Sequence, residues 1–453
     1  MKGGGSVSIK VGFVSLGCSK NLCDTENMMG ILAEKGFEIT PNAADADVCV
    51  VNTCGFIDSA KEESINTLLE MAQYKNGKCR LLIAAGCLAQ RYAKEIAEDL
   101  PEVDIILGTT ALTDIADAIE KGLSGEKREY IHDRDAPETP NLPRVQTTPD
   151  YTAFLKIAEG CDNKCTYCAI PYIRGKYRSR PIESIVSEAE ALAENGVKEL
   201  IVVAQDTTRY GIDLYSEKKL PQLLHKLCKI EKIKWVRVHY CYPEETDDAI
   251  IDAFASEEKI VKYMDIPVQH GSDSVLRRMG RRTNRAQIEM LVKKLREKMP
   301  GITLRTSIIT GFPGETEEEF DELCDFLKTV RFDRVGAFAY SCEEGTPAAR
   351  MQNQIPEEVR LERRNRVMEL SQQISLKRNL SMLGKTLTVM TEGFEDNLYY
   401  GRSEGESADV DPKIYFAAHR DLKPGDFVQI RIKSADEYDL CGEEIQSSEG
   451  EDD

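Results

Sequence analysis

The sequence has no hydrophobic run long enough to cross a membrane. Its apolar stretches all fall short of the roughly 18 to 20 residues that a bilayer span needs. The N-terminal stretch MKGGGSVSIK also lacks the apolar core of a secretory signal. We therefore expect a cytoplasmic protein with no membrane partner.

Positive charge is outnumbered, because 59 Lys and Arg stand against 78 Asp and Glu and the formal net charge is -19. A chain that bound nucleic acid through broad phosphate contacts would be expected to carry the opposite sign. Extended nucleic-acid binding is therefore disfavoured, although a local basic patch could still bind. With 41% hydrophobic and 30% charged residues and no low-complexity bias, the composition is that of a globular protein, and 453 residues predict about three domains.

Cysteine, by contrast, is abundant, with 14 residues. Thiols stay reduced in the cytosol and rarely form structural disulfides there. Metal binding or redox chemistry becomes the leading explanation for so many cysteines.

Residues 9–125 alternate strand-like and helix-like segments. The strand-like runs KVGFVSL, DVCVVNT and RLLIAAG are separated by the helix-like stretches TENMMGILAEKG and ESINTLLEMAQ. This spacing predicts an α/β domain with a parallel sheet and crossover helices. The prolines and mixed charges of residues 126–147 predict a linker after it.

Residues 148–376 contain six strand-like runs, each followed by a helical stretch: AFLKIAE, KELIVVA, KWVRVHY, KYMDIPV, ITLRTSII and RVGAFAY. Six such units in series predict a partial (βα)6 barrel, with chemistry on the loops at the carboxyl ends of its strands. Residues 379–445 carry short alternating runs bounded by turns, which predict a small all-β barrel. The acidic tail, residues 446–453, is expected to be disordered. The predicted fold class is thus a multidomain α/β protein with a C-terminal β-barrel.

The stretch GCDNKCTYC places Cys161, Cys165 and Cys168 on the loop after the first strand of the predicted central barrel. Thiolates are the usual ligands of iron–sulfur clusters, and three of them can hold three irons of a cubane cluster. The fourth iron is then open to a substrate or cofactor. A structural zinc would need a fourth Cys or His nearby, and the nearest histidine is His132 in the predicted linker.

Three further cysteines, Cys18, Cys54 and Cys87, each follow a predicted parallel strand, with a glycine alongside. The carboxyl ends of such strands share one edge of the sheet, where ligands bind. The three thiols can therefore converge on a second cluster. The alternative is three buried structural cysteines, which are common individually.

The CxxxCxxC spacing after the first strand of a six-unit barrel resembles the radical S-adenosylmethionine (SAM) superfamily, in which the open iron chelates SAM. With the three N-terminal cysteines and a C-terminal barrel similar to a TRAM domain, the chain resembles the methylthiotransferase family from about residue 9 to 445. The resemblance implies two 4Fe-4S clusters, with Cys161, Cys165 and Cys168 on the SAM-cleaving one. The second cluster, on Cys18, Cys54 and Cys87, would take up or activate sulfur.

The resemblance also implies residues near SAM. Tyr167 matches the aromatic residue that the superfamily usually has between its second and third cysteines, and it could also simply pack the loop. Gly311 and Gly314 in GFPGET could let the backbone approach a ligand, and the same segment reads as a tight turn into a helix capped by Thr316 and Glu319. Gln205 and Gln269 end predicted strands and could face the site; Asp206, His270 and Ser272 are their neighbours.

GCSKN at the first cysteine is similar to the branch of this family that modifies a ribosomal protein, whereas members that modify tRNA adenosine typically carry a GCQMN-like stretch. That branch methylthiolates the β-carbon of an aspartate in a small-subunit ribosomal protein, with SAM as both radical source and methyl donor. Residues 378–445 hold 8 Lys or Arg and 14 Asp or Glu, a net of -6, which suits a basic protein better than RNA.

Two other readings remain open: a tRNA substrate, and a non-enzymatic iron or zinc protein. Besides the ribosomal protein, free or on the ribosome, the partners would be a reductant and a sulfur donor, and the sequence identifies neither of these two. The basic run from Arg277 to Arg282 reads as a solvated helix face. The other eight cysteines are interpreted as structural: Cys23, Cys49, Cys79, Cys228, Cys241, Cys324, Cys342 and Cys441.

Overall fold

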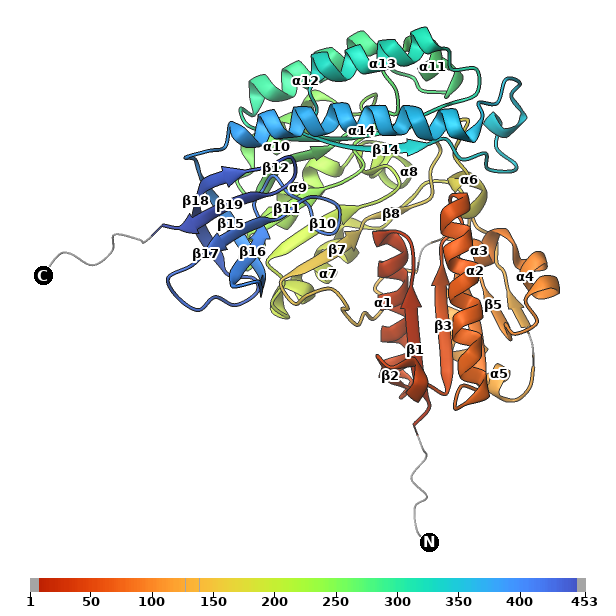
Figure 1. The fold of residues 1–453 in the computed structure, drawn as a ribbon. Helices are drawn as coiled ribbons and strands as arrows, with labels where there is room; N and C mark the ends of the chain where they lie inside the picture. The colour runs from red at the N-terminus through yellow and green to blue at the C-terminus, as the bar shows by residue number, and fades with distance from the viewer. Residues whose placement is uncertain (1–7, 127, 138, 446–453) are drawn as a thin grey trace, which may run out of the picture.

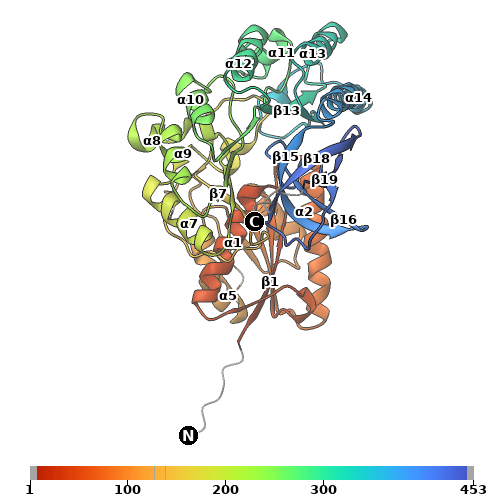
Figure 2. The same cartoon turned by 90° about the vertical axis from the view of Figure 1, so that its left-hand side faces the viewer.

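The computed structural model describes residues 8–126, 128–137 and 139–445. They form an N-terminal α/β domain, a central α/β domain and a C-terminal β-barrel (Figure 1). In both views the N-terminal domain lies below the other two, and the C-terminal barrel lies against the side of the central domain (Figure 2). The predicted tail at 446–453 lies outside the described residues. No helix in the described ranges is long and apolar enough to span a bilayer.

The N-terminal domain has a parallel six-stranded sheet in the order β2-β1-β3-β4-β5-β6. Its strands are β1 (Lys10–Ser15), β2 (Glu38–Thr40), β3 (Val48–Thr53), β4 (Leu81–Gly86), β5 (Ile105–Leu107) and β6 (Arg128–Tyr130). The helices are α1 (Ser19–Glu34), α2 (Asp58–Ala72), α3 (Cys87–Arg91), α4 (Ala93–Asp99) and α5 (Ile115–Leu123). The parallel sheet is confirmed, and the edge strand β6 uses residues that the prolines and charges had suggested for a linker.

Alternation along β3 explains how this sheet is covered on both faces. Val48 and Val50 pack with α1 and α5, while Cys49 and Val51 point to the other face, toward α2, α3 and α4. Successive strand residues point to opposite faces, so a strand buried on both sides reads as a continuous apolar run. Cys49 and Cys79 lie in the second of these cores.

The central domain has six parallel strands in the order β14-β13-β12-β11-β10-β7, which leaves the barrel open between β7 and β14. They are β7 (Thr152–Lys156), β10 (Glu199–Val203), β11 (Trp235–Val238), β12 (Ile260–Asp265), β13 (Thr303–Thr310) and β14 (Arg334–Ala339), with a small ladder of β8 (Ala158–Glu159) and β9 (Arg178–Ser179). The helices are α6 (Ile170–Ile173), α7 (Ile182–Glu194), α8 (Ile212–Tyr215), α9 (Leu220–Cys228), α10 (Asp248–Ser256), α11 (Asp273–Arg278), α12 (Arg285–Lys298), α13 (Glu317–Val330) and α14 (Glu357–Leu380).

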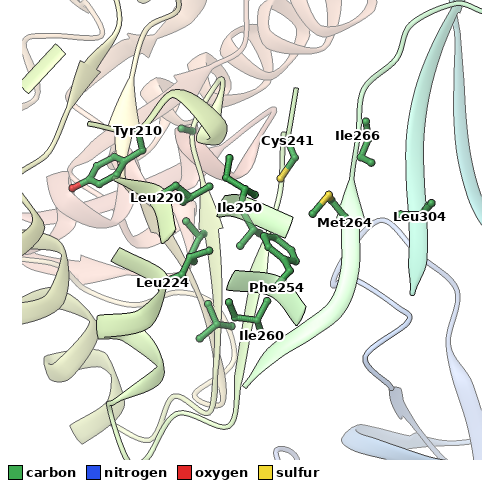
Figure 3. Close-up of a cluster of buried hydrophobic side chains, with 14 of the residues drawn as sticks. Tyr210, Leu220, Leu224, Cys241, Ile250, Phe254, Ile260, Met264, Ile266 and Leu304 are labelled. Carbon is green, nitrogen blue, oxygen red and sulfur yellow. The ribbon is translucent and has the colours of Figure 1, made fainter. Parts of the chain in front are cut away.

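The core of the central domain lies between its sheet and the outer helices (Figure 3). Leu224 of α9, Phe254 of α10 and Met264 of β12 all belong to this apolar cluster, and their side chains are fully buried. Cys241 lies in the same apolar cluster, which agrees with its interpretation as a structural cysteine.

The C-terminal domain is a closed barrel in the order β15-β16-β17-β19-β18. Its strands are β15 (Thr386–Glu395), β16 (Leu398–Arg402), β17 (Ile414–Ala417), β18 (Phe427–Ala435) and β19 (Leu440–Glu444). A buried carboxylate, Glu199 of β10, ties it to the central sheet, because it pairs with Arg402 at 2.6 Å and with Arg237 at 2.8 Å. Trp235 also meets Phe427 edge to face, with ring centroids 4.8 Å apart.

Candidate active site

The CxxxCxxC loop runs from residue 160 to 169, between β8 and α6, at the carboxyl end of the central sheet. Gly160 has a φ of 75°, and a Cβ there would lie 2.0 Å from the carbonyl oxygen of Lys176, so only glycine lets the chain enter the loop this way. The amide of Cys161 donates to Gly175 O, and that of Thr166 donates to Met279 O. The loop is thus held from both sides.

The three thiols of this loop are poorly exposed: Cys161 and Cys165 are buried and Cys168 is half-buried. Burial raises the pKa of the Cys161 thiol to about 12 and raises that of Cys168 as well, since a thiolate loses hydration there. Arg281 supplies a compensating charge, because its Nη1 lies 4.0 Å from Sγ of Cys165. The interpretation of the basic run as a solvated face is wrong for Arg281, whose side chain is fully buried and paired with Glu244.

Tyr167 packs against the buried cluster of Val275, Met279, Phe312, Tyr340 and Ala348. Its aromatic ring therefore fixes the middle of the cysteine loop. This packing role and contact with a cofactor are compatible with each other.

Cys18, Cys54 and Cys87 follow β1, β3 and β4, which are neighbours in the N-terminal sheet. Cys18 caps the start of α1, and Cys87 is the first residue of α3. Gly17 allows the chain before Cys18 to lie close to Cys54. Its φ is 84°, and a Cβ at this position would lie 2.9 Å from Sγ of Cys54. The predicted convergence of the three strand ends on one edge is therefore present in the structure.

Asn21 holds these strand ends together. Its Nδ2 donates to the carbonyl oxygens of Leu16, Asn52 and Thr53, at 2.8, 3.2 and 3.1 Å. Its Oδ1 accepts from Nη2 of Arg174 at 2.8 Å. The asparagine of GCSKN thus fixes the cysteine edge and also connects it to the central domain.

Arg174, at the end of α6, joins the two cysteine sets. Its Nε and Nη2 each lie 3.3 Å from Sγ of Cys87, and Ala169, next to Cys168, shares a buried cluster with Cys87. Burial raises the pKa of Cys87 to about 12, and the nearby guanidinium opposes this rise.

A closed ring of buried ion pairs surrounds this junction. Arg174 Nη1 pairs with Asp24 at 2.6 Å and Glu159 at 2.8 Å, and Lys156 pairs with the same two carboxylates at 2.5 and 3.0 Å. The ring has two cations and two anions. This ring is not predicted from the sequence. Its charged residues lie near the cysteines along the chain, but their pairing becomes evident only once the two domains are docked.

Of the other candidate residues, Gln205 and Gln269 lie at strand ends as predicted. Gln205 Nε2 donates to Glu159 Oε1 at 2.6 Å, and its Oε1 is buried with no hydrogen-bond partner in the described chain. Gln269 has a φ of 75°, a conformation that non-glycine residues rarely adopt and that is frequent at functional sites. The neighbouring Asp206 is buried and accepts from Asn163 of the cysteine loop at 2.8 Å, and burial raises its pKa to about 6.

The GFPGET segment wraps around the carboxylate of its own Glu315. Gly311 N and Phe312 N donate to Glu315 Oε2 at 3.0 and 3.2 Å, and His270 Nε2 lies 3.4 Å from the same oxygen. A Cβ on Gly311 would lie 2.2 Å from Cγ of Arg360 on α14, whereas Gly314 has open space around it. Thr316 and Glu319 form the predicted capping box of α13.

Among the described residues, no three His, Cys, Asp or Glu side chains stand in an arrangement that holds one metal ion. A cubane cluster does not require this, because each thiolate binds a different iron. Each set offers three thiols with an arginine guanidinium against one of them, Arg281 at Cys165 and Arg174 at Cys87. The residues present therefore fit an anionic iron–sulfur cluster at both places.

Comparison with known proteins finds matches in three parts of the chain. Residues 155–327 match the radical SAM superfamily, residues 10–108 match an uncharacterized protein family named UPF0004, and residues 383–445 match the TRAM domain. The fold resembles the radical SAM methyltransferase TsrM from Kitasatospora setae, with a TM-score of 0.54 and 15% identity over 76% of this chain and 77% of that chain. Fold and site thus define a radical SAM enzyme.

Curated relatives identify the family within that class. The ribosomal protein uS12 methylthiotransferase RimO of Lachnoclostridium phytofermentans is 52% identical over 96% of this chain and 99% of its own length. The protein of the same name from Pelotomaculum thermopropionicum is 51% identical over 97% of this chain and 100% of its own. The chain belongs to the RimO family of radical SAM methylthiotransferases.

Proposed function

We propose that this chain replaces a hydrogen on the β-carbon of an aspartate in ribosomal protein uS12 by a methylthio group. The observation that carries the proposal is the identity of about half of all residues, along nearly the whole chain, to proteins named for methylthiolation of uS12. SAM and 4Fe-4S clusters are the cofactors that membership of this family implies.

The cofactors would supply an organic radical and the methyl group, and the second cluster would take up or activate sulfur from an external donor. In our proposal Cys161, Cys165 and Cys168 hold the SAM-binding cluster. Cys18, Cys54 and Cys87 hold the second cluster. The buried guanidinium groups of Arg281 and Arg174 offset the negative charge of the thiolates.

The remaining candidate residues shape the SAM side of the site. Tyr167 fixes the cysteine loop by packing, and Gln205 presents a buried amide oxygen without a partner in the described chain. Gln269, Gly311 and Gly314 lie on the loops that follow β12 and β13. We place all five next to SAM, because chemistry in such barrels lies at the carboxyl ends of the strands.

The net charge of the C-terminal barrel favours a protein over RNA as partner. Residues 378–445 hold 8 basic and 14 acidic residues. Such a surface attracts a basic protein and repels phosphate. In our proposal the enzyme acts in the cytoplasm on uS12, alone or within the ribosome, with an external reductant and a sulfur donor.

The deciding experiment is mass spectrometry of uS12 and of tRNA, each incubated with the anaerobically reconstituted chain, SAM, sulfide and reductant. Replacement of H by SCH3 adds about 46 Da to one aspartate by the proposed chemistry. The Cys161→Ala/Cys165→Ala/Cys168→Ala variant is the matched control and should leave uS12 unchanged. A gain on tRNA instead would move the chain to the other substrate class, and no gain on either would refute the proposal.

A further inference from the structure

Lys20, in the first turn of α1, has a buried ammonium group that is not ion-paired with any carboxylate among the described residues. Only 6% of the residue is exposed. Its Nζ lies 3.7 Å from the centroid of the Tyr240 ring. Within the described part of the chain no carboxylate forms an ion pair with this ammonium group, and the side chain that it contacts and hydrogen-bonds is that of Tyr240. A buried ammonium group without an anionic partner is costly, so such a group usually has a ligand or a specific function.

The carboxylates nearest to Lys20 are already paired with other cations. The neighbouring ring of Asp24, Glu159, Lys156 and Arg174 is balanced, with two negative and two positive groups joined by four ion pairs. Both carboxylates of the ring are thus already paired with Lys156 and Arg174, and neither forms an ion pair with Lys20 in the described residues. An incoming carboxylate could pair with Lys20 directly.

The position of Lys20 is between the two halves of the proposed active site. It follows Cys18 by two residues, at the cysteine edge of the N-terminal sheet. The ring beneath it belongs to Tyr240, which follows β11 at the carboxyl end of the central sheet, where chemistry is expected.

Tyr240 is held in an uncommon conformation to make this contact. Its φ is 60°, and its amide donates to Asp265 Oδ2 at 3.1 Å. Strained backbone of this kind persists where the surroundings fix it, often at functional sites. The face of the tyrosine ring attracts the ammonium group and keeps it in place, while leaving N–H donors free for a ligand.

We propose that Lys20 binds the carboxylate of the aspartate that is modified. This inference rests on the proposed function. The carboxylate is bonded directly to the β-carbon that must reach the cysteine edge, so a cation beside Cys18 is placed to orient it. A charge-assisted hydrogen bond from a buried ammonium group would select aspartate over a neutral side chain at the same position of uS12.

The test is a double-mutant cycle on binding, without reductant so that no turnover occurs. The modified aspartate is first located by mass spectrometry, and uS12 and its Asp→Asn variant are then titrated against the reconstituted wild-type chain, Lys20→Met and Lys20→Arg. Lys20→Met should weaken binding of uS12 by about tenfold or more and leave binding of the Asp→Asn protein nearly unchanged. Lys20→Arg should recover part of the loss. Lys35→Met, at the exposed end of the same helix, is the control and should change neither affinity.

Other outcomes overturn the inference. If Lys20→Met weakens binding of both uS12 forms equally, or of neither, the ammonium group does not recognise the carboxylate. Loss of iron from Lys20→Met together with equal weakening would assign the charge to the sulfur ligands instead. If the wild-type chain itself neither binds nor modifies uS12, the proposed function fails, and the inference fails with it; this result is distinguishable because it does not involve Lys20.

Discussion

The guanidinium group of Arg174 lies against the sulfur of Cys87, with Nε and Nη2 each 3.3 Å from Sγ. Arg174 follows Cys168 by six residues, whereas Cys87 belongs to the N-terminal domain. One buried side chain thus connects the two proposed cluster sites. Its Nη1 is held by Asp24 and Glu159, so its position does not depend on the thiol alone.

Replacing Arg174 should alter the second cluster. Arg174→Gln removes a cation from beside a proposed ligand, which disfavours the reduced, more negative cluster and should lower its reduction potential. Loss of such a supporting group typically weakens metal binding about 10- to 100-fold. The potential and the iron content are measured in a chain in which Cys161, Cys165 and Cys168 are alanine, so that only the N-terminal site contributes. Arg174→Lys keeps the charge and should lie between wild type and Arg174→Gln; an unchanged potential in Arg174→Gln would contradict this role.

The two cysteine sets should load iron independently. With both sites filled by 4Fe-4S clusters the chain should hold about eight irons, and replacing Cys18, Cys54 and Cys87 together by alanine should leave about four. Replacing Cys161, Cys165 and Cys168 should likewise leave about four. Cys241→Ala, in the apolar core, is the control and should retain all the iron. Iron analysis and the visible absorption spectrum measure this, and loss of all iron from either triple variant would show that the sites are not separate.

Local patterns in the sequence predict most of the fold. The apolar runs of β3, β4, β7, β10 and β11 are long and continuous because these strands are buried on both faces. Strands of two or three residues, such as β2, β8 and β9, carry too little pattern to be recognised. The break between β7 and β8, inside what reads as one apolar run, is set by pairing with β9 and not by composition.

The cysteine sets are readable from sequence because spacing along a loop and position after a strand are local properties. The groups that surround them are not. Arg174 and Cys87 are 87 residues apart, and Lys20 and Tyr240 are 220 apart, so their contacts depend on how the two domains dock. Arg281 shows the same limit: its neighbours Arg277 and Arg282 are exposed, and only the packed structure shows that it alone turns inward to Cys165.

The core of the central domain should tolerate little loss of volume. Phe254 of α10 is fully buried among apolar side chains (Figure 3). Phe254→Ala removes these contacts and leaves a cavity, which should reduce the free energy of unfolding by about 3 to 5 kcal/mol. Met290→Ala, at a site of α12 that is 66% exposed, is the matched control and should change it by less than about 0.5 kcal/mol. Denaturant unfolding of both variants measures this, and equal effects would mean that the core is not packed as described.

Docking of the C-terminal barrel should weaken in acid, through Glu199. Burial alone would raise the pKa of this carboxyl group, but Arg402 and Arg237 outweigh burial and lower it from 4.5 to about 2. Because the folded state favours the ionised form, the stabilisation is complete above pH 4.5 and is lost as the pH falls toward 2, a loss of about 3 kcal/mol.

Trp235 is the single tryptophan and packs on Phe427 of this barrel, so its fluorescence should report undocking. Glu199→Gln should be less stable than wild type at pH 7, and this difference should shrink by about 3 kcal/mol near pH 2. Glu194→Gln is the control. Its side chain is 71% exposed, so its stability relative to wild type should not depend on pH in this way. A Glu199→Gln deficit that is the same at both pH values would mean that this carboxylate does not hold the barrel through its charge.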